Sequence, residues 1–202
     1  MRKIYEDTIV IATHNEGKLL EISNLFSKFK LSVLSVSEFN LKEPIETEDN
    51  FIGNARIKAH FAAKNSNLLS LSDDSGIMVD GLNGAPGVYT ADWATTQNGR
   101  DYNLAMTKVW ALLEKNNIPS PRTAHFICVL CLTWPDGHDE IFEGKVSGKI
   151  TWPMRGENGF GFDPIFIPNG HKKTFGEMNP NEKHKMSHRS IAFGKLINAC
   201  LS

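Results

Sequence analysis

An α/β fold is predicted for this chain, because strand-like apolar runs alternate with helical patterns along its first half. Thr8–Ala12 is β-branched, apolar and bounded by polar residues, which indicates a strand buried on both faces. A helical pattern follows at once, with Leu19, Ile22 and Phe26 on one face. The alternation repeats with a strand at 31–36 and a helix from about residue 50 to 64.

The composition is that of an ordinary globular protein. The chain has 202 residues, 41% of them hydrophobic and 22% charged, which predicts a single domain over residues 1–202, or one domain with two lobes. A net charge of -1 gives no reason to expect nucleic acid or a membrane as partner. Three cysteines form no disulfide framework, and no apolar run reaches the roughly 18 residues of a membrane helix. We therefore expect a cytoplasmic protein.

Two adjacent carboxylates, Asp73 and Asp74, follow an apolar run at 68–71 that is predicted to be a short buried strand. Neighbouring strand residues point to opposite faces, so the two can share a site only if the strand breaks, which Gly76 permits. Carboxylates gathered there need a cation, and Mg²⁺ is the ion that hard oxygen ligands and phosphates select. The glycine-rich run at 80–87 is expected to be a shaped loop, which a plain surface turn does not explain. We predict a magnesium–phosphate site.

Residues 13–18 join the first strand to the first helix and are suited to phosphate. Backbone N–H groups at a helix start bind anions, and Lys18 adds a positive charge. The loop is not a P-loop, because Ala12 replaces the required glycine and Leu19 the hydroxyl residue. In the second helix, which begins after an acidic loop at 43–49, Lys58 is expected to reach a triphosphate bound at the same site.

The second half of the chain predicts a helix at 101–115, a strand hairpin formed by 122–133 and 140–150, and a last helix from about 189. Cys128 and Cys131 have C-x-x-C spacing inside a strand, so we interpret both as packing residues. His184 and His188 have the spacing of a metal pair, but they lack an acidic third ligand. An anion or base-edge site is therefore favoured there.

The loop at 155–164 alternates glycine and phenylalanine. A base can stack on such rings, an interaction worth roughly 1–3 kcal/mol, and one of Phe160 and Phe162 is expected to lie in the core instead. If the dispersed cations converge on Asp73 and Asp74, the ligand is a metal-bound polyphosphate with a ring at one end. That ligand is a nucleoside triphosphate.

A set of motifs in one order then carries a family resemblance. The motifs are Thr13–Lys18, Phe51–Ala55 with Lys58-Ala59, Asp73–Gly76, Gly84–Tyr89, Gly159–Pro164 and Ser187–Arg189. The chain resembles the inosine/xanthosine triphosphate pyrophosphatases, which hydrolyse ITP, dITP and XTP to the monophosphate and pyrophosphate. The resemblance runs from about Thr8 to the C-terminus.

This resemblance implies an α/β fold with an elongated central mixed β-sheet flanked by helices, and two lobes with the active-site cleft between them. It also implies a homodimer, Mg²⁺ and a purine nucleoside triphosphate as substrate. Carried over by position, the site residues fall into three groups. The residues expected to hold the triphosphate are Thr13, His14, Asn15, Glu16, Gly17, Lys18 and Lys58. The expected catalytic residues are Asp74, Asp73 and Lys18; Asp74 is the proton acceptor, and both aspartates are expected to bind the metal. The residues expected to contact the substrate, most of them at its base, are Ser75, Phe160, Gly161, Phe162, Asp163, Lys183, His188 and Arg189.

The chain departs from the family pattern at Gly53, where the family usually has a metal-binding glutamate. Asp73, Glu48 or water is the expected replacement, and a glutamate restored by Gly53→Glu is expected to lower the Mg²⁺ concentration needed for half-maximal activity. Two alternatives stay open on the sequence alone. One is a pyrophosphatase for modified or pyrimidine nucleotides, and the other is a nucleotide-binding sensor with little turnover.

Overall fold

The computed structural model describes residues 1–201, and the chain divides into two compact units. Unit 1 contains Met1–Asp74, Cys128–Gly144 and the residues from Arg189 onward, while unit 2 contains Ser75–Ile127 and Lys145–His188. The sequence predicted a single domain, or one domain with two lobes. Among the described residues, no helix is both long and apolar enough to cross a membrane.

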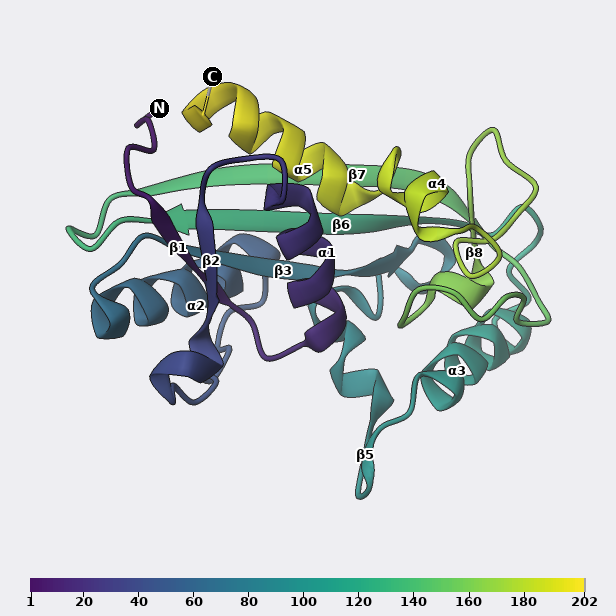
Figure 1. Ribbon diagram of the computed structural model, residues 1–202. Coiled ribbons are helices and arrows are strands. Elements are labelled where there is room, and N and C mark those ends of the chain that lie inside the picture. Colours follow the sequence, from purple (N-terminus) through teal and green to yellow (C-terminus); the bar gives the residue numbers. More distant parts are fainter. Residues whose placement is uncertain (202) are drawn as a thin grey trace. The chain divides into compact units, whose positions relative to one another are not determined.

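A mixed sheet of six strands is flanked by helices, as expected (Figure 1). The strands are β1 Thr8–Ala12, β2 Ser32–Ser35, β3 Ser70–Val79, β6 Thr123–Thr133, β7 Asp139–Ile150 and β8 Phe166–Pro168, in the order β2-β1-β3-β6-β7-β8, with β4 Thr95–Thr96 and β5 Gly99–Arg100 as a separate pair. The helices are α1 Glu16–Phe26, α2 Phe51–Ser66, α3 Tyr102–Lys115, α4 Pro180–His184 and α5 His188–Leu196. β1 runs parallel to β2 and β3, and β7 is antiparallel to β8.

Alternation along the strands of unit 1 sends side chains to two different helical layers. Ile9 and Ile11 of β1 pack in one core cluster with residues of α1 and α5. Val10 and Ala12, which point the other way, pack instead against Ala62 of α2. α1 and α5 therefore cover one face of the unit 1 strands and α2 covers the opposite face (Figure 1).

Unit 2 has a core of its own, built mainly from aromatic and aliphatic residues of α3, β6 and β8. Its buried members include Val109 of α3, Phe126 of β6 and Phe166 of β8. The rings of Phe126 and Phe166 meet edge to face, with their centroids 4.8 Å apart. The predicted hairpin is present as β6 and β7, and the predicted helix is present as α3.

β3 is longer than expected, and the predicted break after Asp74 is wrong. The strand continues through Asp73, Asp74 and Gly76 to Val79, and a short 3₁₀ turn, Asp80–Leu82, follows it. Ile77 and Val79 explain the continuation, because both are fully buried in the core of unit 2. Glycine at position 76 is tolerated inside the strand, where it weakens pairing without ending it. Asp73 and Asp74 therefore lie within a regular strand and not in a loop.

Candidate active site

Asp74 lies on the face of β3 that packs against α2. The preceding residue on that face, Ser72, donates its hydroxyl to the carbonyl of Ala55 in α2 at 2.6 Å. Lys58 extends from the next turn of α2 and places its ammonium 2.7 Å from Asp74 Oδ1. The same ammonium lies 2.7 Å from Oε1 of Glu46, in the acidic loop before α2. The other oxygen of Asp74, Oδ2, is buried and has no hydrogen-bond partner among residues 1–201.

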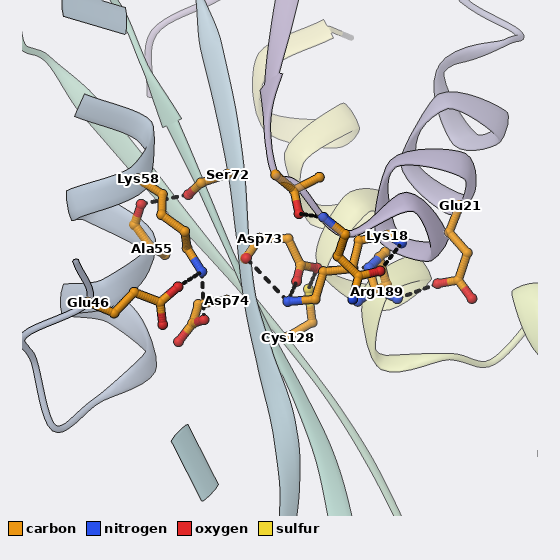
Figure 2. A network of polar contacts seen from close by, with 12 residues as sticks. Lys18, Glu21, Glu46, Ala55, Lys58, Ser72, Asp73, Asp74, Cys128 and Arg189 are labelled. Carbon is orange, nitrogen blue, oxygen red and sulfur yellow. Dashed lines mark hydrogen bonds and ion pairs between the residues drawn. The ribbon is translucent and has the colours of Figure 1, made fainter. Parts of the chain in front are cut away.

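Asp73 points to the opposite face of β3, toward α1 and α5 (Figure 2). Its Oδ2 accepts a hydrogen bond from Arg189 Nε at 2.8 Å, and its Oδ1 lies 2.7 Å from the ammonium of Lys18. The thiol of Cys128 donates to the same Oδ2 at 3.1 Å. Arg189 in turn pairs with Glu21 of α1, so the carboxylate belongs to a buried chain of opposite charges.

The two adjacent carboxylates therefore differ in charge behaviour. Burial opposes ionisation of Asp73, but the positive charges of Arg189 and Lys18 outweigh it and hold the pKa well below its usual range. For Asp74 burial is also the largest effect, and here it prevails over the attraction of Lys58, so the pKa is raised. A carboxylate with a raised pKa and an unpartnered oxygen is a candidate proton acceptor or metal ligand.

The shared site that the sequence suggested for Asp73 and Asp74 required the strand to break. Because β3 is regular, one metal ion held by both side chains does not follow from this geometry. Arg189 was expected to contact the base, and the structure shows its guanidinium paired with carboxylates. Its side chain is 1% exposed and is held in unit 1 by Asp73 and Glu21.

The expected phosphate loop begins directly after β1, at the start of α1. Asn15 caps the helix by accepting a hydrogen bond from the backbone N–H of Lys18 at 3.0 Å, and Thr13 accepts one from the backbone of Asn15 at 3.2 Å. His14 contacts the carbonyl of Leu41 through Nε2 at 2.8 Å. Glu16 and Gly17 open the helix itself. The structure thus brings Lys18 and the helix start to the edge of the Asp73 cluster.

Gly53 and Asn54 hold the acidic loop that carries Glu46. The side-chain amide of Asn54 makes two hydrogen bonds to the backbone of Glu48, one to its N–H and one to its carbonyl, each 3.0 Å long. A Cβ built on Gly53 would stand 2.6 Å from Cβ of Glu48, nearer than atoms can approach. The glycine therefore makes room for Glu48, and the loop that this fixes brings Glu46 to Lys58.

A second cluster of the expected residues forms in unit 2. Lys183 of α4 is 2.7 Å from Asp163 Oδ2, and both side chains are buried. The same oxygen accepts a hydrogen bond from the backbone of Phe160 at 2.9 Å, and the Lys183 ammonium lies 4.9 Å from the Phe160 ring centroid. Phe162 is buried, as expected for one of the two rings, while Phe160 is half-buried.

The remaining residues expected to contact substrate also belong to unit 2. His188 stacks on Phe126, with centroids 4.9 Å apart and an interplanar angle of 11°. Gly161 has a φ of +66°, a conformation that favours glycine, in the turn between the two phenylalanines. Ser75 is half-buried in β3. Neither His184 nor His188 belongs to a group of three or more metal-binding side chains within the described part of the chain.

Three residues of the unit 1 cluster were not singled out by the sequence as site residues. Glu46 lies in an acidic loop whose composition alone indicates a solvated surface, and Glu21 looks like a polar residue of an amphipathic helix. Cys128 was expected only to pack, and it does pack, although its thiol also contacts Asp73. No local pattern marks these residues, because their partners come from other elements.

The unit 1 residues fit a hard divalent cation. Mg²⁺ is commonly held in proteins by one or two carboxylates, with water and substrate phosphates completing its shell. Asp74 offers a buried oxygen without a hydrogen-bond partner in the described chain, and the carboxylate of Glu46 contacts the same ammonium as Asp74. No group of three or more His, Cys, Asp or Glu gathers among residues 1–201.

Known proteins similar to this chain agree with the motifs. The model of the Ham1 family matches residues 9–199. A dITP/XTP pyrophosphatase of Ruegeria pomeroyi is 56% identical over 194 residues, which cover 96% of this chain and 95% of that protein. Its counterpart in Agrobacterium fabrum is 52% identical over 212 residues, covering 100% of this chain and 99% of the relative.

Solved structures show the same fold. A HAM1 protein from Coxiella burnetii superimposes with a TM-score of 0.87 at 36% identity, covering 96% of this chain and 98% of the other. The Staphylococcus aureus Ham1 protein gives a TM-score of 0.82, also at 36% identity, over 95% of this chain and 97% of that one. The matches extend along nearly the whole sequence and include both units, and on this ground the chain belongs to the Ham1 family.

Proposed function

We propose that this protein hydrolyses nonstandard purine nucleoside triphosphates, namely ITP, dITP and XTP, to the monophosphate and pyrophosphate. The observation that carries the chemistry is the buried carboxylate of Asp74, which has one oxygen on Lys58 and the other without a partner in the described chain. The names of the relatives, which are dITP/XTP pyrophosphatases, support the choice of substrate.

Asp74 is the residue that we assign to the attacking water. Water attacks the α-phosphorus and pyrophosphate leaves, so a carboxylate must orient the water and accept its proton. Oδ2 of Asp74 is available for that proton, and the raised pKa makes this oxygen a better acceptor than an ordinary aspartate. Asp73, which Arg189 and Lys18 keep ionised, serves to position Lys18 and not to exchange protons.

In this proposal, the residues that bind the phosphates belong to unit 1. The backbone of residues 13–18 and the N-terminus of α1 bind phosphate oxygens, with Thr13, His14, Asn15, Glu16 and Gly17 shaping the loop. Lys18 and Lys58 stabilise the negative charge that builds on the leaving pyrophosphate. Asp74 and Glu46 would hold Mg²⁺, which supplies charge neutralisation to the phosphates when bound. Glu46 replaces Asp73 as the second metal carboxylate, because it shares the Lys58 ammonium with Asp74.

In this proposal, the residues that contact the base belong to the unit 2 cluster. A 6-keto purine presents a hydrogen-bond acceptor at C6, which suits donors such as His188 and Lys183, whereas adenine presents a donor there. Phe160 offers a half-buried ring for stacking, held by the hydrogen bond from its backbone to Asp163. Ser75, Gly161 and Phe162 are retained as substrate contacts or supports of this loop. Hydrogen-bond donors of the protein would face the amino donor of adenine, and this mismatch lowers kcat/KM for adenine nucleotides by orders of magnitude.

Two properties of the whole protein complete the proposal. We expect a homodimer, which light scattering on the purified protein tests directly. We also place the protein in the cytoplasm, since Cys128, Cys131 and Cys200 are all buried free thiols.

Pyrophosphate release with Mg²⁺ from ITP, dITP, XTP, ATP and UTP is the experiment that tests the function. The proposal expects high kcat/KM for the first three and little turnover of ATP or UTP. A preference for UTP or dTTP would favour a pyrimidine pyrophosphatase. Tight ITP binding without pyrophosphate release would favour a nucleotide-binding sensor.

A further inference from the structure

The ammonium of Lys58 lies between two carboxylates and is shielded from water. Nζ is 2.7 Å from Asp74 Oδ1 and 2.7 Å from Glu46 Oε1. The side chains of Lys58 and Asp74 are each 7% exposed, and that of Glu46 is 31% exposed. A cation bridged by two carboxylate oxygens in a mostly dry place is also the arrangement in which a divalent metal ion is held. In this structure the position between the two carboxylates is therefore occupied by the ammonium of Lys58.

The bridge leaves Asp74 only partly satisfied. Its Oδ2 is buried and has no hydrogen-bond partner within residues 1–201, and leaving a buried polar group unpaired is unfavourable. A hydrated divalent cation at Oδ1 would bring water to this oxygen, which an ammonium with no water of its own does not. The carboxylates of the free protein are therefore arranged for a cation that Lys58 replaces incompletely.

We propose that Lys58 is a resident counter-ion, whose ammonium occupies the position of the divalent cation between Glu46 and Asp74 and leaves it when the cation enters. The displaced ammonium is then the group that contacts the phosphates. The inference rests on the proposed function, because it takes the metal site to be the one formed by Asp74 and Glu46.

The exchange requires only the end of one side chain to move. Lysine carries its charge on a flexible four-carbon stem, and the helix from which it extends is anchored by the Asn50 cap and by the bond from Ser72 to Ala55. Mg²⁺ approaches oxygens to about 2.0–2.1 Å and carries twice the charge of an ammonium, so it outcompetes Lys58 at a sufficient concentration.

Lys18 provides the natural contrast on the other face of β3. Its carboxylate, Asp73, is also held by Arg189 and by the thiol of Cys128. Asp73 therefore keeps Arg189 as a positive partner if Lys18 moves. Because its negative charge is already balanced, Asp73 is not expected to attract a metal ion. Of the two faces of β3, the Lys58 face combines a removable cation with a carboxylate oxygen that has no partner in the part of the chain that the structure describes.

A resident counter-ion makes metal and phosphate binding support each other. Competition from Lys58 weakens the apparent Mg²⁺ affinity of the free protein, since the site accepts metal only when the ammonium is elsewhere. A phosphate that draws Lys58 away frees the carboxylates, and by linkage the bound metal frees Lys58 for phosphate. The protein is therefore expected to bind Mg²⁺ weakly until a triphosphate is present.

Calorimetric titration of the nucleotide-free protein with Mg²⁺ tests this directly. Lys58→Met is expected to tighten the dissociation constant by about tenfold or more, because the competing cation is gone. Lys18→Met is the matched control, since it also removes a nearby positive charge but not one that bridges Asp74 and Glu46; we expect a change below about threefold. Unchanged or weaker binding in Lys58→Met, or equal tightening in both variants, would overturn the proposal.

A second measurement on the unmodified protein remains informative if Lys58→Met does not fold. Lys58 is 7% exposed and should react slowly with an amine-acetylating reagent. Saturating Mg²⁺ is expected to raise the acetylation rate of Lys58 several-fold in mass-spectrometric peptide mapping, relative to Lys18. Continued protection of Lys58 in a protein that binds Mg²⁺ would count against displacement.

The proposed function and this inference fail in different ways. If Mg²⁺ binds neither the free protein nor its complex with an α,β-methylene analogue of ITP, the metal site is wrong and both proposals fall. If Mg²⁺ binds, and Asp74→Asn abolishes the binding, the metal site stands. If Lys58→Met then binds Mg²⁺ no more tightly than the wild type, only the counter-ion role of Lys58 is wrong.

Discussion

Asp73 and Asp74 are chemically identical neighbours on one strand, and they have opposite surroundings (Figure 2). Asp73 meets Arg189, Lys18 and the thiol of Cys128, and its pKa is held well below the usual range. Asp74 contacts the ammonium of Lys58, has one oxygen without a partner among residues 1–201, and has a raised pKa. The strand's alternation turns one carboxylate toward α1 and α5 and the other toward α2.

The different surroundings suit the two carboxylates to different roles, Asp73 to structural support and Asp74 to reactivity. A carboxylate surrounded by positive charge is fixed in its ionised form, so it can orient its neighbours but is a poor proton acceptor. A carboxylate whose pKa is raised by burial, with an unpartnered oxygen, binds a proton more readily than an ordinary aspartate. In the proposed function, Asp73 is therefore the positioning residue of this dipeptide and Asp74 the reactive one. Four predictions test that division.

The largest effect is expected for Asp74→Asn. The amide keeps the shape of the site but cannot accept the proton of the attacking water, so kcat for ITP should fall by about 10²–10⁴-fold while circular dichroism stays unchanged. A folded variant that keeps more than about a tenth of wild-type kcat, a loss below 1.4 kcal/mol, would show that Asp74 is not the key carboxylate.

Arg189→Ala tests the other half of the comparison. Removing one partner of a buried ion pair leaves Asp73 and Glu21 without their shared cation, which typically costs about 3–5 kcal/mol. Chemical denaturation should show this loss. Arg56→Ala is the control, because its pair with Asp139 is half-exposed and should be worth less than about 1 kcal/mol.

The base-pocket role first expected for Arg189 predicts a different result. In that case the variant would lose kcat/KM for ITP while the low turnover of ATP stayed unchanged and the protein remained stable. A stable, ITP-specific defect would return Arg189 to the base. A large loss of stability would assign it to Asp73.

The secondary structure was predictable where the apolar pattern is local. β1 was expected at Thr8–Ala12 and has those bounds, and α2, expected from about residue 50 to 64, covers Phe51–Ser66. β3 was cut short because a glycine after two aspartates is typical of a turn. The signal that overrules Gly76 is the alternation of Ile77 and Val79, whose burial depends on a core formed by distant segments.

The charged residues that the sequence grouped together do form ion pairs in the structure, but the pairings themselves were not predictable. Charged residues beside strand ends and helix starts identified Lys18, Lys58, Asp73 and Asp74 from residue type and position. Which lysine faces which carboxylate depends on the layers that cover the two faces of β3. Glu46 was missed for the same reason, since an acidic residue in a loop has no periodic pattern to indicate its partner.

Opposite pH dependence of stability is the third prediction. The pKa of Asp73 is lowered on folding, so Asp73 contributes stability above its ordinary value of 3.8 and loses it as pH falls through the folded value. The pKa of Asp74 is raised, so its contribution is present at low pH and is lost as pH rises through the folded value.

Asp73→Asn should therefore be less stable than wild type at neutral pH, with the gap closing in acid below 3.8. Asp74→Asn should be no less stable than wild type at neutral pH. Urea unfolding of the three proteins across an acid-to-neutral series measures both gaps. Parallel curves for the two variants would mean that the carboxylates are equivalent, and the comparison would be lost.

The smallest effect concerns Gly53, which shapes the Asp74 side. Alanine in a helix is normally better than glycine by about 0.8–1 kcal/mol, and Gly194 of α5 should show that gain, because an added Cβ there meets nothing within 4 Å. At Gly53 the added Cβ would stand 2.6 Å from Cβ of Glu48. Gly53→Ala should therefore show no gain in denaturation, and a full gain equal to that of Gly194→Ala would mean that the loop yields freely.

Gly53→Glu extends the argument from stability to the metal. The sequence suggested that a glutamate here would add a ligand and lower the Mg²⁺ requirement. The structure reverses the expected sign, because any side chain at 53 must displace Glu48, whose backbone Asn54 holds through two hydrogen bonds of 3.0 Å. Displacing that loop draws Glu46 away from Lys58 and Asp74, so the Mg²⁺ concentration for half-maximal ITP hydrolysis should rise. A lower requirement would mean that the new carboxylate reaches the metal while Glu46 stays in place.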